Sequence, residues 1–320
     1  MTIATFFLSS GRCGTQWLAK HLWDIYGDRA FVTHEPLRSN YLPRQLLGLN
    51  DLQASENASQ ILTHVARIER QLEKTDYVEC GWPCYGAISH FAERFYGRVR
   101  IVHLPRHPIW SASSMVTHAY YRVPPRRDRL TERALLTPFD AGVRFPEYRQ
   151  RWPELNEFEK CLYFWAEVHA LGLELQSTLE VPWLRLKSEE LFTEAGLARL
   201  LAFLELPERE TMQAALGRRI DHFSFKTDTA WDVASIERHP RVVEVAEALG
   251  YDSIAADEKS IRARYRAERS GAEVPEPSAA RSLSSDAPCP CGSGRAYRDC
   301  HGKPVRVASL QVPPRPNRHG

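Results

Sequence analysis

Residues 9–16 combine glycines with side chains that donate hydrogen bonds, and this combination suits a phosphate group. The stretch reads Ser-Ser-Gly-Arg-Cys-Gly-Thr-Gln. Its two glycines permit a tight turn in which backbone N–H groups converge, and its arginine, threonine and glutamine add donors without a metal ion. The residues predicted to bind the phosphate are Ser10, Gly11, Arg12, Cys13, Gly14, Thr15 and Gln16. Such a turn also closes loops in many α/β proteins, so the stretch alone leaves a structural role open.

A second pair of anion-binding side chains lies further along the chain. Arg106 follows the apolar stretch of residues 99–104, and Ser114 comes eight residues after it. If a strand and then a helix form here, the arginine lies at the strand's carboxyl end and the serine two turns into the helix. The two side chains can then converge on one dianionic phosphate. The alternative is that Arg106 forms a structural ion pair.

The apolar pattern of the chain predicts the elements that position these residues. Residues 3–8 form a continuous apolar run, as expected for a parallel strand buried on both faces, and residues 15–27 carry apolar side chains at helical spacing. Residues 99–104 predict a second strand and residues 109–121 a second helix. Strands that alternate with helices favour an α/β fold, a three-layer parallel sheet with helices on both faces. Ligands bind such sheets beyond the carboxyl ends of the strands.

Later segments extend this pattern. Residues 157–179 predict a long amphipathic helix, residues 181–186 a short strand, and residues 241–250 the last helix of the domain. Residues 117–156 are rich in Arg and Pro and show little periodicity, so we expect a loop or lid there.

The first stretch departs from the G-x-x-x-x-G-K-[ST] pattern of nucleotide triphosphatases, because no lysine follows Gly14. It resembles instead the 5′-phosphosulfate loop of sulfotransferases that use 3′-phosphoadenosine 5′-phosphosulfate (PAPS). Arg106 and Ser114 resemble the family's 3′-phosphate motif, although His107 stands where the family usually has Asp or Asn. The resemblance covers about residues 1–251 and implies a P-loop NTPase-like sulfotransferase fold.

Two softer matches follow in the same region. Residues 183–192 resemble the family's strand and acidic segment, in which Glu189 would have a structural role. Residues 223–231 resemble the late loop that closes over the nucleotide, which makes Lys226 a candidate phosphate contact.

The resemblance also implies a magnesium-independent reaction and its participants. Sulfuryl transfer to a hydroxyl or amine needs a base for the acceptor and positive charge on the bridging oxygen of the leaving nucleotide, which Arg12 and the loop amides would supply. Golgi-type and several bacterial sulfotransferases place a catalytic glutamate about twenty residues after the loop, where this chain has Glu35. Burial would raise its pKa into a useful range. Adjacent residues of an extended segment point to opposite sides, so only one of His34 and Glu35 is expected to face the donor, and His34 is the alternative base.

Three other histidines are expected to have structural roles. His103 lies inside a predicted strand, where a satisfied core histidine is commoner than a catalyst. His21 and His169 are expected to be surface or packing residues of their helices.

Near the carboxyl end, four soft metal ligands gather in one short stretch. Cys289, Cys291, Cys300 and His301 surround a Gly-Ser-Gly turn, and four such ligands complete a tetrahedral zinc site. Residues 288–303 closely resemble the SEC-C motif of the SecA translocase ATPase, including its closing Cys-His-Gly. We expect a structural zinc ion and a basic surface that contacts a protein or ribosomal partner.

Composition predicts four parts of the chain. With the resemblances above, these parts are a sulfotransferase domain at residues 1–258, a flexible linker at 259–287, a SEC-C-like zinc motif at 288–304 and a disordered tail at 305–320. The length of 320 residues, 43% of them hydrophobic, suffices for one substantial domain with an appendage.

Charge and hydropathy narrow the function. The 42 Lys and Arg against 40 Asp and Glu leave a net charge of +2, so we expect no specific nucleic-acid binding. No apolar run approaches the roughly 18 residues of a membrane span, and no secretory signal pattern begins the chain, so we expect a cytoplasmic location. The acceptor stays open among sugars, lipids, tyrosine and small alcohols. Two alternatives also stay open, a P-loop small-molecule kinase and a non-catalytic nucleotide-binding adaptor directed by the zinc tail.

Overall fold

The computed structural model describes residues 1–121, 134–216, 233–251 and 261. The chain divides into two units, Met1–Ala272 and Glu273–Gly320, and every described residue belongs to the first. Lys226, the predicted linker and the predicted zinc ligands lie outside the described residues.

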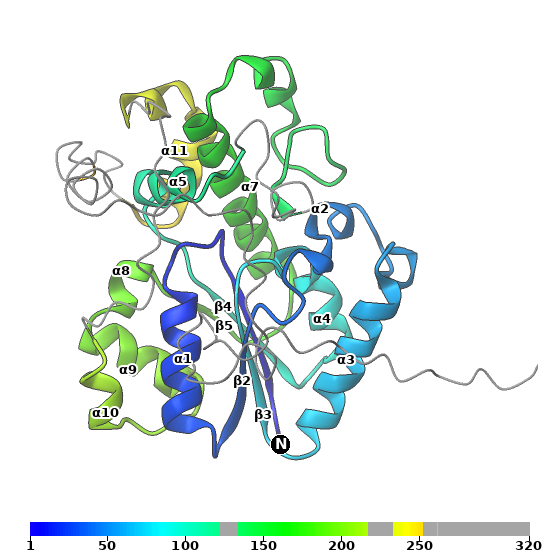
Figure 1. Ribbon diagram of the computed structural model, residues 1–320, viewed down its shortest axis with the longest axis vertical. Coiled ribbons are helices and arrows are strands. Elements are labelled where there is room, and N and C mark those ends of the chain that lie inside the picture. The colour runs from blue at the N-terminus through cyan, green and yellow to red at the C-terminus, as the bar shows by residue number, and fades with distance from the viewer. Residues whose placement is uncertain (122–133, 217–232, 252–260, 262–320) are drawn as a thin grey trace, which may run out of the picture. The chain divides into compact units, whose positions relative to one another are not determined.

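A five-stranded sheet forms the centre of the first unit (Figure 1). In order across the sheet, the strands are β2 (Ala30–His34), β3 (Asp76–Cys80), β1 (Ala4–Leu8), β4 (Val99–His103) and β5 (Trp183–Arg185). All neighbouring strands run parallel. The predicted α/β fold with a parallel sheet is therefore confirmed.

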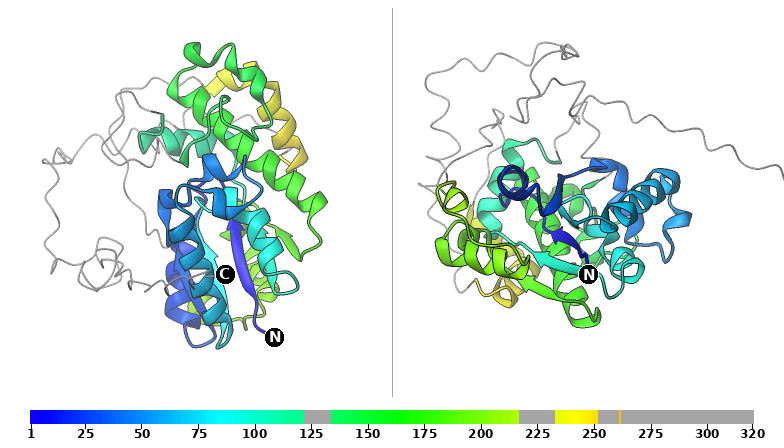
Figure 2. Two further views of the ribbon diagram at one scale, coloured as in Figure 1. Left: turned by 90° about the vertical axis from the view of Figure 1, so that its right-hand side faces the viewer. Right: turned by 90° about the horizontal axis from the view of Figure 1, so that it is seen from below.

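Helices cover both faces of the sheet, as the views in Figures 1 and 2 show. Side chains of β1 alternate between two hydrophobic clusters, with Phe6 and Leu8 in one and Phe7 in the other. The helices that contribute to the Phe7 cluster include α1 (Thr15–Tyr26), α8 (Ser188–Leu191), α9 (Glu194–Phe203) and α10 (Glu210–Gln213). Those that contribute to the Phe6 cluster include α2 (Pro43–Leu46), α3 (Ala58–Leu72), α4 (Ile88–Arg94), α5 (Pro108–Thr117), α7 (Glu157–Thr178) and α11 (Pro240–Ala248). Burial on both faces explains the continuous apolar run at the start of the chain.

Helix α7 is central to the fold, and its middle part is not amphipathic as predicted. Its buried side chains include the consecutive run from Cys161 to His169, which spans all sides of a helix. The reason is that it packs against α5 on one side and α11 on another (Figure 2). A capping box between Asn156 and Glu159 fixes where it begins. Among the described residues, no helix combines the length and apolar character needed to cross a bilayer.

The larger described part of the predicted lid, residues 134–156, is fastened to the domain. Its short 3₁₀ turns are Pro146–Arg149 and Trp152–Glu154. Buried Glu167 of α7 accepts hydrogen bonds from the backbone N–H groups of Arg144 at 2.9 Å and Phe145 at 2.7 Å. Backbone bonds to a buried carboxylate hold this segment in place.

Candidate active site

The phosphate-binding loop joins the carboxyl end of β1 to α1, as predicted, and it adopts an unusual backbone. Gly11, Arg12 and Gly14 have φ values of 83°, 59° and 95°. A Cβ atom at Gly14 would lie 2.6 Å from the Phe192 ring, and one at Gly11 would lie 3.0 Å from the Trp82 ring. Each glycine is thus required for two reasons: its positive φ disfavours other residues, and a neighbouring ring leaves little room for a Cβ atom. A left-handed arginine is uncommon and marks a conformation that the surroundings impose.

The predicted 5′ and 3′ anion-binding residues meet at this loop. Arg12 Nε donates to Ser114 Oγ at 3.1 Å, although the two residues are 102 positions apart. Arg106 Nη1 donates to the backbone carbonyl of Arg12 at 2.8 Å, and Trp165 Nε1 donates to the carbonyl of Arg106 at 2.8 Å. Two arginines at one loop create a positive field that a phosphate dianion would neutralise. The described partner of Arg106 is thus a backbone carbonyl of the loop rather than a carboxylate.

Two further contacts anchor the loops. Ser188 Oγ donates to the carbonyl of Cys13 at 2.9 Å. Glu189, for which a structural role was expected, accepts from the backbone N–H of His107 at 3.0 Å and from the Tyr251 hydroxyl at 3.1 Å. His107 makes no side-chain cap on α5, in agreement with its departure from the family's Asp or Asn.

Glu35 follows β2 and lies in an enclosed position beside β3. Its Cγ would be only 2.7 Å from a Cβ at Gly81, so the approach of the carboxylate needs that glycine. Burial raises the pKa of Glu35 to about 7, the attraction of Arg38 and Arg12 opposes the rise, and the charge of Glu79 adds to it. A carboxyl with this pKa can accept a proton near neutral pH.

His34 lies beside Glu35, so these two side chains do not point to opposite sides as expected for an extended segment. His34 Nε2 is 3.6 Å from Glu35 Oε1 and 3.5 Å from Thr15 Oγ1. The reason is the left-handed φ of 48° at Glu35, which ends the extended alternation. The predicted base and its alternative therefore both lie near the loop.

Sequence reasoning missed Glu79 and also missed the contact between the predicted Ser10 and His169, both of which lie under this site. Glu79, 1% exposed, accepts hydrogen bonds from the hydroxyls of Tyr41 and Tyr77 and lies 3.0 Å from His64 Nε2. Ser10 Oγ lies 3.1 Å from Nε2 of His169. An acidic residue inside the apolar strand DYVEC was the available signal for Glu79.

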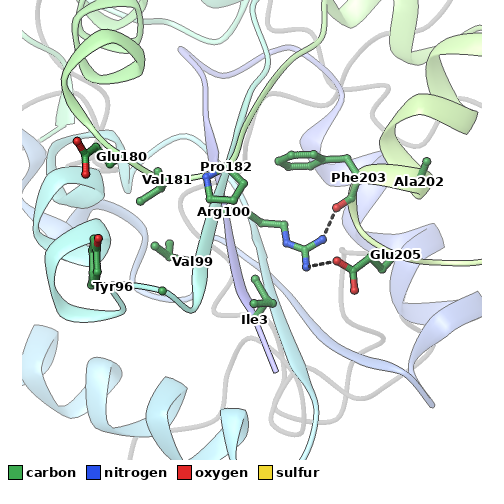
Figure 3. Close-up of a pocket in the computed structure, with 11 residues that line it drawn as sticks. Ile3, Tyr96, Val99, Arg100, Glu180, Val181, Pro182, Ala202, Phe203 and Glu205 are labelled. Carbon is green, nitrogen blue, oxygen red and sulfur yellow. Dashed lines mark hydrogen bonds and ion pairs between the residues drawn. The ribbon is translucent and has the colours of Figure 1, made fainter. Parts of the chain in front are cut away.

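The cavity in Figure 3 lies elsewhere, near the amino ends of the strands. Its lining includes Ile3, Val99 and Pro182, which precede or begin β1, β4 and β5. Arg100 in its wall pairs with Glu205 at 3.0 Å (Figure 3). It contains none of the residues predicted for the site.

The tail outside the described residues matches a known family model. The model described as the SEC-C motif matches residues 287–303. The chain carries a SEC-C motif. This confirms the motif that the sequence predicts.

Part of the chain is also similar to a SecA protein. The chain is 26% identical over 178 residues to protein translocase subunit SecA of Methylobacillus flagellatus, and the match covers 51% of this chain. It spans only 18% of that SecA, so the relative's activity and partners do not transfer as a whole.

Solved sulfotransferase structures are similar to this chain over most of its length. The sulfotransferase domain from the curacin biosynthetic pathway has a TM-score of 0.46 at 16% identity, covering 79% of this chain and 99% of its own. The domain from the Synechococcus PCC 7002 olefin synthase has 0.45 at 17%, covering 79% and 96%. A sulfotransferase from Alicyclobacillus acidocaldarius has 0.43 at 14%, covering 82% and 99%. At these TM-scores the similarity supports no argument about function. The functional argument rests on the residues of the site.

Proposed function

We propose that this chain is a sulfotransferase that moves a sulfuryl group from PAPS to a hydroxyl or amine. The observation that carries the proposal is the contact of Arg12 with Ser114 and Arg106, beside a glutamate whose pKa is raised to about 7. Two anion-binding groups and a base then share one edge of the sheet. This is the set of groups that in-line sulfuryl transfer requires.

In the proposed reaction, Glu35 takes the proton of the acceptor hydroxyl as its oxygen attacks sulfur. The new O–S bond forms while the S–O bond to the 5′-phosphate breaks, and the electron pair leaves with the nucleotide. Arg12 and the loop N–H groups stabilise the charge that develops on that leaving oxygen. The His34 ring lies next to this carboxylate, with its Nε2 3.6 Å from Glu35 Oε1, and is the alternative base.

Arg106 and Ser114 are assigned to the 3′-phosphate of the donor. Both already contact Arg12, Ser114 through its hydroxyl and Arg106 through the loop carbonyl. A phosphate between them would replace the Arg12–Ser114 bond with charge-assisted bonds, which are stronger. We assign Lys226, outside the described residues, to the same nucleotide on the sequence resemblance.

The donor assignment is tested by nucleotide binding. Adenosine 3′,5′-bisphosphate should raise the melting temperature more than ADP or ATP at equal concentration, because only it carries a 3′-phosphate. Equal shifts would contradict the assignment. Transfer from radiolabelled PAPS to a lysate, unchanged by EDTA, would support the enzyme over a kinase or a binding adaptor.

For the SEC-C motif, we propose a structural zinc ion held by Cys289, Cys291, Cys300 and His301, and recruitment of a protein or ribosomal partner in the cytoplasm. The purified protein should hold about one equivalent of zinc, measured by elemental analysis. A chain truncated before Ser282 should lose the zinc and the partner but keep its melting temperature and nucleotide affinity. Unfolding of the truncated chain would contradict an independent role for the motif.

A further inference from the structure

Behind the phosphate-binding loop, three buried side chains from three elements form a continuous hydrogen-bonded chain. Ser10 Oγ lies 3.1 Å from His169 Nε2, and His169 Nδ1 lies 2.9 Å from His103 Nε2. Exposed fractions are 1% for Ser10 and 0% for both histidines. These hydrogen bonds therefore connect β4 through α7 to the loop, and all three side chains are shielded from water.

The imidazoles of His103 and His169 are both neutral. Burial lowers the pKa of His103 to about 3, helped by the positive charge of Arg185, which pairs in register with it on β5. Burial also lowers the pKa of His169 well below its ordinary value, and the neighbouring His103 adds to this. Each ring thus carries one N–H, so each contact in the chain has a definite direction.

Two directions are possible, and the end of the chain distinguishes them. Among the described residues, His103 Nδ1 is buried and has no hydrogen-bond partner. If the donors pointed from Ser10 toward His103, this nitrogen would be an orphaned buried N–H, which folded proteins rarely contain. In the opposite direction it is an unprotonated lone pair, since His103 Nε2–H donates to His169 and His169 Nε2–H donates to Ser10.

We propose that His169 and His103 are both Nε2–H tautomers, and that they direct the hydroxyl hydrogen of Ser10 to the anion bound in the loop. Because Ser10 already accepts from His169, its own O–H is available as a donor. His169 is then a positioning residue. The anion itself rests on the proposed function, in which it is the 5′-phosphate group of the donor.

Helix α7 couples this serine to the second anion-binding group. Trp165 lies one turn before His169, their rings are 4.8 Å apart, and Trp165 Nε1 donates to the carbonyl of Arg106. The ring of His103 fits only because position 172 is glycine, where a Cβ would lie 2.6 Å from its Cε1. One helix turn thus sets the position of both Ser10 and Arg106.

The tautomers are measured directly by ¹⁵N NMR of labelled histidine side chains, with His103→Gln and His169→Gln used to assign the signals. We expect two neutral rings, each protonated at Nε2, unchanged from pH 5.5 to pH 8. A ring protonated at Nδ1, or a ring that titrates in this range, would overturn the proposal. This readout needs no ligand.

The effect on the anion is measured with adenosine 3′,5′-bisphosphate. His169→Leu and Ser10→Ala should each weaken its binding about tenfold, and the double variant should be no weaker than either single one. His169→Gln should recover most of the affinity, because its amide can still donate to Ser10.

The matched control is His239→Leu, since His239 is equally buried but bonds to Tyr148 at 3.1 Å, away from the loop. It should lower the melting temperature and leave nucleotide affinity unchanged. If His169→Leu behaves in the same way, His169 is only structural and the proposal fails. If the wild-type chain binds no such nucleotide, the proposed function fails and Ser10 has no anion to bind, whatever tautomers NMR finds.

Discussion

The two halves of the sheet's carboxyl edge differ in their ionisable side chains, with two arginines in the basic half and two glutamates in the acidic half. In the β1–β4 half, Arg12 and Arg106 meet at one loop. In the β2–β3 half, Glu35 lies near enough to Glu79 for that charge to raise its pKa. The first half is built to hold an anion and the second to hold a proton, so binding and proton transfer can be changed separately.

The two glutamates of the acidic half differ from each other as well. Glu79 is surrounded by two tyrosine hydroxyls and an imidazole, which satisfy it as a buried structural carboxylate. Glu35 lies instead at the end of a strand, with the His34 ring 3.6 Å from it. A carboxylate with fewer fixed partners is the one that can change its protonation state during a reaction.

The largest expected effect comes from a substitution in the acidic half alone. Glu35→Gln should reduce turnover by about 10² to 10⁴, because it removes the base and keeps the shape of the side chain. Affinity for adenosine 3′,5′-bisphosphate should not change. Rates with radiolabelled PAPS and calorimetric binding measure the two quantities. His34→Ala is the matched variant and should stay within about tenfold of wild type, whereas the reverse ranking would make His34 the base.

The next effect breaks the basic half alone. Arg106→Ala should weaken adenosine 3′,5′-bisphosphate binding by about one to two orders of magnitude, since a charge-assisted bond is lost. ADP binding should change much less, which titration calorimetry can measure. Arg100→Ala removes a buried arginine whose partner is Glu205 at the far end of the sheet, and should leave both affinities unchanged. A similar loss from both variants would mean that Arg106 acts only through folding.

The smallest effect concerns stability and pH. Because the folded-state pKa of Glu35 is raised from 4.5 to about 7, the folded protein keeps a proton that the unfolded chain releases. Stability from this group is therefore fully present below pH 4.5 and falls as the pH rises toward 7. The melting temperature of Glu35→Gln should consequently rise relative to that of wild type between pH 5 and pH 8. A difference in melting temperature that stays constant across this range would mean that the raised pKa does not belong to Glu35.

Several features of the site could be predicted from the chain itself. The spacing of Arg106 and Ser114, and the glycines at 11 and 14, are local patterns that report on one turn and one helix. The structure brings the two patterns together through the Arg12–Ser114 bond. The amphipathic assignment of residues 157–179 failed over residues 161–169, where α7 is buried on all sides by elements distant in sequence.

By itself, the sequence determined the alternation of strands and helices, the glycine loop and the SEC-C motif, because each depends on residues close together along the chain. Tertiary structure alone decided that Glu35 packs on Gly81 and that Ser10 meets His169. These contacts join residues 46 and 159 positions apart in the sequence. Burial and the direction of a hydrogen bond are properties of the packed neighbours, so no local pattern carries them.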